Sequence, residues 1–424
     1  MTDAPARPAA DHRTAAVQRR TLGVLSAAQI VSGVGVAVGL ALSSVVVDQL
    51  SGNTVISGFA GTATVLGAAL LALPTAKAAG RGGRRAGLAL AYAAAVVGCL
   101  VSALAISLGS WQLLLAGLVL VGGGSAGNLA ARYSATDLSP KGHAARHLSL
   151  VVWMATIGSV AGPNLAKPAD EIGMNAGLVA NAGPFAFSAM AFAVALLIVF
   201  AGLRPDPLKL ARSLDGSKPE APAGDKTIRN AWDTLRSTPM ARRALVMIAV
   251  SHTAMVSVMS MTPVKLHHDG ESLEIIGLVI SLHIAGMYVL SPVVGWLADK
   301  VGRVPVLLLG MSLLLASAVL AGTAGHRTWQ VTAALVILGL GWSCGLVAGS
   351  ALVSESVPIE RRPAVQGLSD LLMNVCGATG TVVAGAIVGL LSYGFLGLVV
   401  GLMVTAAGLW LAAVTAVKRT PQDA

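Results

Sequence analysis

Apolar residues in this chain gather into long runs that short polar segments separate. Twelve of these runs approach or exceed the roughly 20 residues that a helix needs to cross the hydrocarbon core of a membrane. They span residues 22–47, 54–79, 86–108, 112–131, 147–167, 179–202, 243–262, 273–295, 304–322, 329–350, 364–390 and 393–416. The pattern predicts an all-α polytopic membrane protein with 12 transmembrane helices.

One long polar interruption divides these runs into two groups of six. It is rich in Pro, Gly, Ser, Lys and Asp, a composition typical of a linker. We therefore predict five regions along the chain. They are an N-terminal tail at 1–21, a six-helix bundle at 22–202, the linker at 203–242, a second six-helix bundle at 243–416 and a C-terminal tail at 417–424.

Composition and charge support this class. Hydrophobic residues make up 55% of the chain, charged residues 11%, and the mean hydropathy is +0.77. On the predicted topology, 26 of the 29 Lys and Arg residues lie in or beside the tails, the linker and the other loops on one side. The positive-inside rule makes that side cytoplasmic, which places both termini inside a plasma (inner) membrane.

The net charge of +10 does not indicate a nucleic-acid partner, because the basic residues are spread over short loops where they face a lipid bilayer. We expect a monomer without a cofactor. No nucleophile–base set and no phosphate-binding glycine loop occurs in the sequence, so an enzyme is not expected.

The two predicted bundles repeat in sequence. Gly83 and Gly302 are separated by 219 residues, and the same offset relates Met154 to Met373 and Gly158 to Gly377. The later copy reads Gly295-x-x-x-Asp299-Lys300-x-Gly302-Arg303, which resembles the signature loop of the major facilitator superfamily. That resemblance implies a fold of two six-helix bundles and secondary active transport of a small substrate by alternating access.

The same resemblance implies a conformational gate at the two loops. Asp299 would cap a helix start and pair with a basic residue in one of the two states. The first copy has Gly80 at the position of the acid, so we expect an asymmetric gate with its acid in the second half. The residues assigned to the gate are Gly295, Asp299, Lys300, Gly302 and Arg303 in the second half, and Arg81, Gly83 and Arg84 in the first.

The fifth predicted helix contains Gly158, Gly162 and Pro163. They resemble the glycine-proline motif of drug antiporters in the superfamily. Glycine and proline are also common in transmembrane helices for packing reasons. The fourth predicted helix lacks the antiporters' basic residue over 114–121, which weakens the antiporter interpretation.

Two predicted helices of the second half carry soft ligands. His252, Met255 and Met259 lie at i, i+3 and i+7 and share one stripe, while His283 and Met287 share a face at i and i+4. Polar side chains inside a membrane are costly and therefore suggest function. Thioethers with imidazoles suit Cu(I), although methionine also fills gaps in helix packing.

The pair Met-x-x-x-Met and His-x-x-x-Met resembles the motif pair of the CcoA-like copper importers, the CalT family. The resemblance implies copper uptake through Met255, Met259, His283 and Met287, and the stripe that His252 shares with Met255 and Met259 makes it a candidate fifth ligand. The same family includes riboflavin transporters. An organic solute, taken up like riboflavin or exported like a drug, is therefore the alternative, with Trp153 and Trp342 as its aromatic contacts.

Two further polar features leave two interpretations each. Asp370, in the eleventh predicted helix, is either a proton-coupling site or the partner of an arginine such as Arg361 or Arg362. The loop at 265–274 contains two histidines and three acidic residues. It either concentrates cations at the outer mouth or is a solvated hairpin loop.

Overall fold

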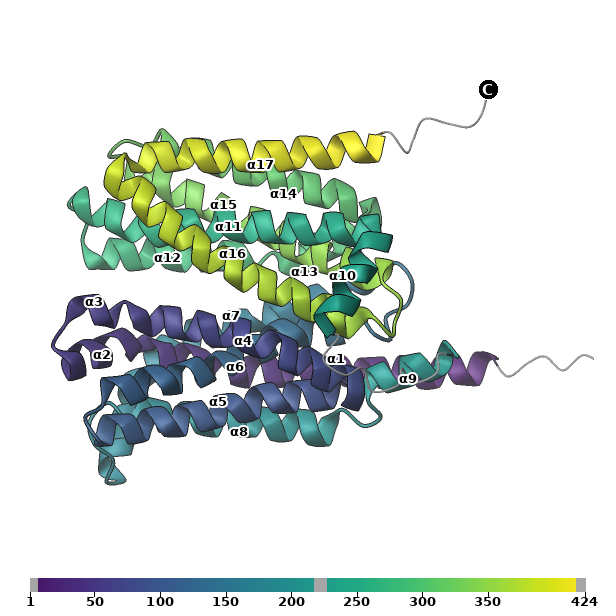
Figure 1. Cartoon of the computed structure of the whole chain (residues 1–424), viewed down its shortest axis with the longest axis horizontal. Coiled ribbons are helices and arrows are strands. Elements are labelled where there is room, and N and C mark those ends of the chain that lie inside the picture. Colours follow the sequence, from purple (N-terminus) through teal and green to yellow (C-terminus); the bar gives the residue numbers. More distant parts are fainter. Residues whose placement is uncertain (1–6, 217–226, 417–424) are drawn as a thin grey trace, which may run out of the picture. The chain divides into compact units, whose positions relative to one another are not determined.

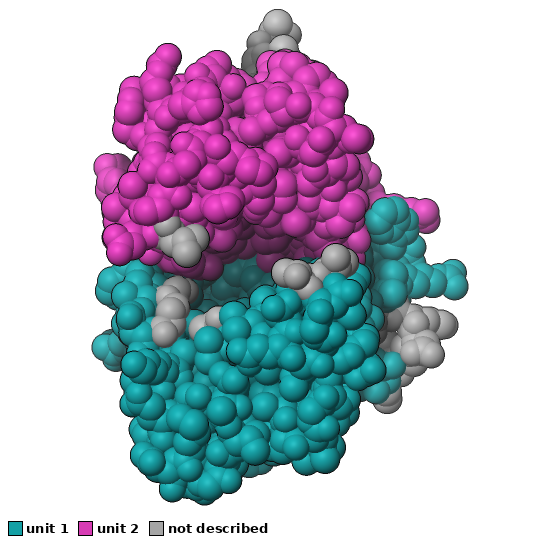
Figure 2. Space-filling model, turned by 90° about the vertical axis from the view of Figure 1, so that its left-hand side faces the viewer, with its two compact units in different colours: residues 1–234, 357–371 teal, residues 235–356, 372–424 magenta. Residues whose placement is uncertain are grey.

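The computed structural model describes residues 7–216 and 227–416, which form 17 helices and no strand (Figure 1). The chain divides into two compact units (Figure 2). Unit 1 contains residues 1–234 and 357–371, and unit 2 contains residues 235–356 and 372–424. Helix α16 therefore begins in unit 1 and continues in unit 2, and residues 357–371 lie in the range predicted for the second bundle.

The helices before the second unit are α1 (Arg7–Ala41), α2 (Ser43–Ser51), α3 (Thr54–Ser57), α4 (Phe59–Gly82), α5 (Arg84–Ser107), α6 (Trp111–Ser134), α7 (Ala144–Asn175), α8 (Gly183–Gly202), α9 (Pro207–Leu214) and α10 (Thr227–Ser237). Those that follow are α11 (Pro239–His268), α12 (Leu273–Tyr288), α13 (Ser291–Val301), α14 (Arg303–Gly322), α15 (Thr328–Ser356), α16 (Arg362–Leu390) and α17 (Tyr393–Ala416).

Twelve segments of the described chain are long and apolar enough to cross a membrane. This confirms the predicted all-α class with 12 transmembrane helices. The predicted run at 273–295 is one span built from two helices, α12 and α13, which meet at Val289 and Leu290. Pro292 lies in the first turn of α13, where its missing N–H removes no helical hydrogen bond, so the chain restarts a helix there.

Glycines bring the backbones of unit 1 into direct contact. A Cβ atom on Gly67 of α4 would lie 1.7 Å from the carbonyl oxygen of Val119 in α6. A Cβ on Gly122 of α6 would lie 2.3 Å from the carbonyl oxygen of Thr64 in α4. Helices in lipid associate through such small residues because lipid tails are as apolar as the side chains. These contacts join α4 tightly to α6.

Helix α15 is the core of unit 2, since 72% of its apolar membrane-spanning stretch is buried, a larger share than in any other candidate span of the described chain. It packs extensively on α11, α12 and α14. Gly345 and Gly349 of α15 face Ser251 and Ile248 of α11, where a Cβ would lie 2.1 Å and 2.5 Å from the nearest side-chain atom. This close packing positions the polar side chains of α11 and α12 around α15.

Candidate functional site

The five residues predicted as metal ligands lie on α11 and α12 of unit 2. These two helices touch each other at few positions and pack mainly on α15. Met255, His283 and Met287 are buried, with 4%, 0% and 7% of their surface exposed, whereas His252 and Met259 are half-buried. Helix α15 therefore contributes to the surroundings of both groups.

His283 is held by the backbone of α15. Its Nδ1 lies 2.7 Å from the carbonyl oxygen of Leu335, and a carbonyl can only accept, so Nδ1 carries the proton and donates. Its buried Nε2 has no hydrogen-bond partner among the described residues. Gly339 permits the close approach, because a Cβ there would lie 2.6 Å from the carbonyl oxygen of His283 and 2.7 Å from the amide nitrogen of Met287. The imidazole is thus held in a fixed orientation by its Nδ1.

Trp342 of α15 connects the other polar side chains of this region. Its indole Nε1 donates to Nδ1 of His252 over 3.1 Å. The ring of Tyr288, at the end of α12, meets the Trp342 ring edge-on with centroids 5.7 Å apart. Gly377 of α16 leaves room for His252, since a Cβ there would lie 2.8 Å from its Nε2. The result is a small aromatic cluster that joins α11, α12 and α15.

Within residues 7–216 and 227–416, no group of three or more His, Cys, Asp or Glu side chains is arranged to hold a metal ion.

The signature loop of the second half has a different geometry from the one predicted. Gly302 has φ of +100°, a conformation that favours glycine, and it is the N-cap of α14 without a side-chain cap. The expectation that Asp299 caps a helix start is wrong. Asp299 lies near the end of α13, and its carboxylate accepts from Arg303 over 2.8 Å. Arg303 also donates to Glu355 over 2.6 Å, so the loop is tied to α15.

The other two gate residues of this loop have simpler surroundings. Gly295 is buried in α13. The ammonium of Lys300 lies 4.7 Å from the centroid of the Trp296 ring and makes a cation–π contact.

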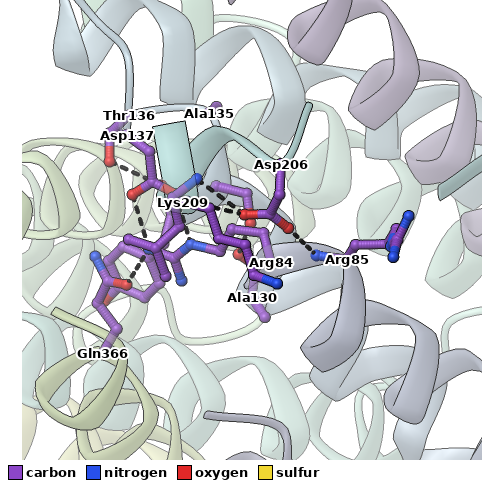
Figure 3. Close-up of polar contacts among 12 residues, drawn as sticks. Arg84, Arg85, Ala130, Ala135, Thr136, Asp137, Asp206, Lys209 and Gln366 are labelled. Atoms are coloured by element: carbon purple, nitrogen blue, oxygen red, sulfur yellow. Dashed lines mark hydrogen bonds and ion pairs between the residues drawn. The ribbon is translucent and has the colours of Figure 1, made fainter. Parts of the chain in front are cut away.

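In the first half, Gly83 has φ of +87° and links α4 to α5. Arg81 is exposed in the last turn of α4. Arg84 opens α5 and is buried, with two nitrogens on the two carboxylate oxygens of Asp137 at 2.7 Å and 2.9 Å (Figure 3). Arg84 also donates to the side-chain oxygen of Gln366 over 2.7 Å. Two parallel charged hydrogen bonds fix the guanidinium in one orientation.

Asp206 provides an acid beside the loop that lacks one in its own sequence. Its carboxylate accepts from the backbone N–H of Arg85 over 2.8 Å and from those of Leu208 and Lys209 over 3.1 Å and 3.2 Å (Figure 3). It thus caps the first turns of α5 and α9, where the helix dipoles favour negative charge. A Cβ on Gly83 would lie 2.4 Å from this carboxylate. Sequence analysis placed Asp206 in the linker and missed this contact.

The predicted fifth-helix motif lies in α7 of unit 1, where its glycines allow close packing on α1. A Cβ on Gly158 would lie 2.5 Å from the backbone of Gly33, and one on Gly162 would lie 2.2 Å from the Cβ of Ala37. Pro163 follows in the same helix. Packing therefore accounts for both glycines.

Asp370 pairs with an arginine, but neither of those considered from the sequence is the partner observed. Arg132 of α6 lies 2.6 Å from its carboxylate, and the two side chains are 1% and 6% exposed. Arg132 directly follows the apolar run predicted at 112–131. Helix α6 continues beyond that run to Ser134, and Arg132 is buried in its last turn.

At the C-terminal end of α11, Asp269 is bound by Lys265 and His326 of unit 2. Lys265 donates to it, and His326 lies 2.8 Å away. Burial would raise the pKa of Asp269, but the hydrogen bonds and charges of Lys265 and His326 outweigh it and hold the pKa below its ordinary value. Glu271 similarly accepts from Thr328. Two acids of the loop at 265–274 thus bind His326 and Thr328, which lie before and at the start of α15.

Comparison with known proteins agrees with this fold. The family model of the Major Facilitator Superfamily matches residues 24–274 and 245–424. The chain is 35% identical to "Uncharacterized MFS-type transporter YdeG" of Bacillus subtilis over 91% of this chain and 89% of the relative. It is 25% identical to "Riboflavin transporter RfnT" of Brucella anthropi over 88% of this chain and 90% of the relative. The crystal structure of the human organic anion transporter MFSD10 has the same fold, with a TM-score of 0.76 at 17% identity over 93% of this chain and 99% of that chain.

Proposed function

The chain belongs to the major facilitator superfamily, and we propose that it is a secondary transporter that imports copper as Cu(I) through α11, α12 and α15. Members of this superfamily are transporters rather than enzymes. Copper is the transported substrate in this proposal and not a resident cofactor.

The observation that carries the copper proposal is the geometry of His283. Metal-binding histidines commonly donate one ring N–H to a carbonyl or carboxylate, which fixes the tautomer and leaves the other nitrogen for the metal. His283 has this arrangement, with Nδ1 on the carbonyl of Leu335 and a buried Nε2 without a partner in the described chain. A buried polar atom without a hydrogen bond is costly, so a ligand that satisfies it is favoured.

The methionines supply the chemistry that Cu(I) prefers. Met287 lies one helical turn from His283, and Met255 and Met259 follow the same spacing on α11. Thioethers bind Cu(I) without a charge and so add no charged group to the membrane interior. A transported ion also needs few and weak ligands, because it must leave again.

A second candidate substrate is an organic solute such as riboflavin. The relative named as a riboflavin transporter favours it, and so does the aromatic cluster of His252, Tyr288 and Trp342. A flat conjugated ring would stack on such side chains. Trp342 is the residue whose loss would affect this substrate most.

The remaining parts of the proposal concern the membrane and the gate. We place the protein in the plasma (inner) membrane as a monomer with both termini in the cytoplasm, because of the Lys and Arg distribution. The ion pairs of Arg84 with Asp137 and of Arg303 with Asp299 and Glu355 would stabilise one state of the cycle. Their rearrangement would accompany the change to the other state.

The test is uptake by proteoliposomes of radioactive copper, kept as Cu(I) with ascorbate, and of labelled riboflavin in parallel. We expect His283→Ala and Met255→Leu to reduce copper uptake about tenfold or more, since leucine keeps the volume of methionine but removes the sulfur. Met261→Leu is the matched control, because Met261 is a half-buried methionine of α11 outside the proposed ligand set.

The two substrates give different outcomes. Copper uptake that is absent from the wild type, or equal in wild type and His283→Ala, would refute the copper proposal. Riboflavin uptake by the wild type that falls in Trp342→Ala and persists in Met255→Leu would support the organic substrate instead.

A further inference from the structure

The segment at 357–371 is attached to unit 1 although it follows the helices of unit 2 in the sequence. It contains the first turns of α16, whose remainder belongs to unit 2. Helix α16 has no break at this boundary.

Four neighbouring residues of α16 make the attachment. Gln366 accepts from Arg84 over 2.7 Å, and Ser369 is 3.2 Å from the hydroxyl of Tyr133. A Cβ on Gly367 would lie 2.3 Å from the Cβ of Ala76. Asp370 accepts from Arg132 over 2.6 Å. Of these four residues, Asp370 alone carries a charge that a proton can remove.

Arg132 keeps other partners when Asp370 is neutral. Its guanidinium donates to the carbonyl of Leu129 over 2.8 Å and to the hydroxyl of Tyr133 over 3.4 Å. It also lies 4.4 Å from the centroid of the Tyr133 ring, which is a cation–π distance. Removing one member of a buried ion pair is costly because it leaves a charge without a partner. Here three contacts within α6 reduce that cost when the carboxylate takes up a proton.

A small cavity reaches the carboxylate. It has a volume of about 20 Å³, and Asp370, Arg84, Tyr133, Gln366 and Thr75 are among its lining residues. This volume holds about one water molecule. The polar lining offers that water hydrogen bonds beside the carboxylate of Asp370.

The charged and titratable groups that face Asp370 come from two helices and one loop. Arg132 and the hydroxyl of Tyr133 come from α6, and Arg84 comes from α5. The charge of Arg84 is balanced by Asp137, which follows α6. Arg132 is thus the cation on which the charge state of Asp370 acts most directly.

We propose that Asp370 is the proton-binding site of the transport cycle and that its protonation releases residues 357–371 from unit 1. The proton binds to a carboxylate oxygen of Asp370 and Arg132 remains a cation, so the ion pair between them becomes a weaker hydrogen bond from a charged donor to a neutral carboxyl group. The proposal rests on secondary transport but not on the identity of the substrate.

The first test needs no substrate. Hydrogen exchange of peptides covering 357–371 is measured on the purified protein in nanodiscs, from neutral to mildly acidic pH, after correction for the intrinsic pH dependence of exchange. In the wild type we expect protection of this segment to fall about tenfold as the pH falls, the loss expected from one charged hydrogen bond. Asp370→Asn should show the weaker protection at every pH.

Two further variants keep this test decisive. Asp370→Glu retains a titratable carboxylate and should restore the pH dependence. Asp170→Asn removes the carboxylate of another acid of unit 1, which accepts from the backbone N–H of Asn181 away from this cluster, and should leave the pH dependence of 357–371 in place. A wild type without pH dependence, or an Asp370→Asn protein that keeps it, would overturn the proposal.

The second test measures coupling in proteoliposomes, with copper or riboflavin according to which the wild type transports. Asp370→Asn should keep exchange of substrate across the membrane at equal pH and lose accumulation driven by a pH gradient at least tenfold. Gradient-driven accumulation at the wild-type level would overturn the proposal. If the wild type transports neither substrate, the proposed substrates fail while the exchange measurement on 357–371 still decides the role of Asp370.

Discussion

The close contact between α4 and α6 leads to a prediction that compares two glycines of the same helix. Gly67 faces the backbone of α6, and a Cβ there would lie 1.7 Å from the carbonyl oxygen of Val119. Gly61 lies six residues earlier, and a Cβ there would meet nothing within 4 Å. Alanine at these two positions therefore adds the same methyl group to the same helix in opposite surroundings.

The magnitude follows from the distances. Real Cβ atoms essentially never approach closer than 3.0 Å, so α4 and α6 would have to separate locally by about 1.3 Å to accept alanine in place of Gly67. Overpacking usually costs about 1–3 kcal/mol, and we expect about 3 kcal/mol because the obstacle is backbone that cannot rotate away. Gly61→Ala should be neutral or stabilising by up to about 1 kcal/mol through helix propensity. The unfolding equilibrium of the two variants should differ by about a hundredfold or more.

The assay is reversible unfolding by sodium dodecyl sulfate in dodecyl maltoside micelles, followed by circular dichroism. Gly67→Ala should shift the transition to a lower detergent fraction, whereas Gly61→Ala should unfold at or above the wild-type fraction. If the two variants unfold within about 1 kcal/mol of each other, the backbone contact is not as close as the distances state and the reasoning fails.

Three other predictions concern charges and backbone conformation. Asp137→Leu should cost about 3–5 kcal/mol by leaving Arg84 charged and buried, and adding Arg84→Met should recover much of the loss, as measured by the same unfolding assay. Asp269→Asn should lower the thermal unfolding midpoint at neutral pH. Folding lowers the pKa of Asp269, so the contribution of its carboxylate to stability is complete above the ordinary carboxylate pKa of about 3.9 and is lost as the pH falls through the folded pKa. The unfolding midpoints of wild type and variant should therefore converge only below about pH 4. Gly83 has a φ of +87°, and a Cβ there would lie 2.4 Å from the Asp206 carboxylate, so Gly83→Ala should lower the free energy of unfolding by about 1–3 kcal/mol in the same assay. A Cβ on Gly80 would meet no atom within 4 Å, so Gly80→Ala should not lower it.

The spans could be predicted from the sequence because each one is a local property. A run of about 20 apolar residues has no other stable place than a membrane or a buried core, and all twelve predicted runs correspond to spans. The break in the eighth span was not predicted, since the apolar run continues through Val289 and Leu290 while Pro292 restarts the helix. Apolar character and helix continuity are different properties of the same residues.

The polar contacts could be predicted only in part, because they join residues far apart in the chain. Asp370 was expected to pair with an arginine, but Arg132 lies 238 residues away and no spacing rule relates them. The carbonyl of Leu335 that orients His283 belongs to an apolar residue and carries no signal in the sequence. Asp206 similarly completes a loop whose own sequence lacks an acid. Such partners are decided by how helices pack.

The assignment of residues 357–371 to unit 1 has a consequence for any attempt to divide the polypeptide. A gene cut within the linker predicted at 203–242 would give an N-terminal fragment without the last segment of its own unit. Arg132 and Arg84 of that fragment would lack Asp370 and Gln366, which only the C-terminal fragment encodes. We therefore expect co-expressed fragments to complement each other only when the C-terminal fragment retains the first turns of α16.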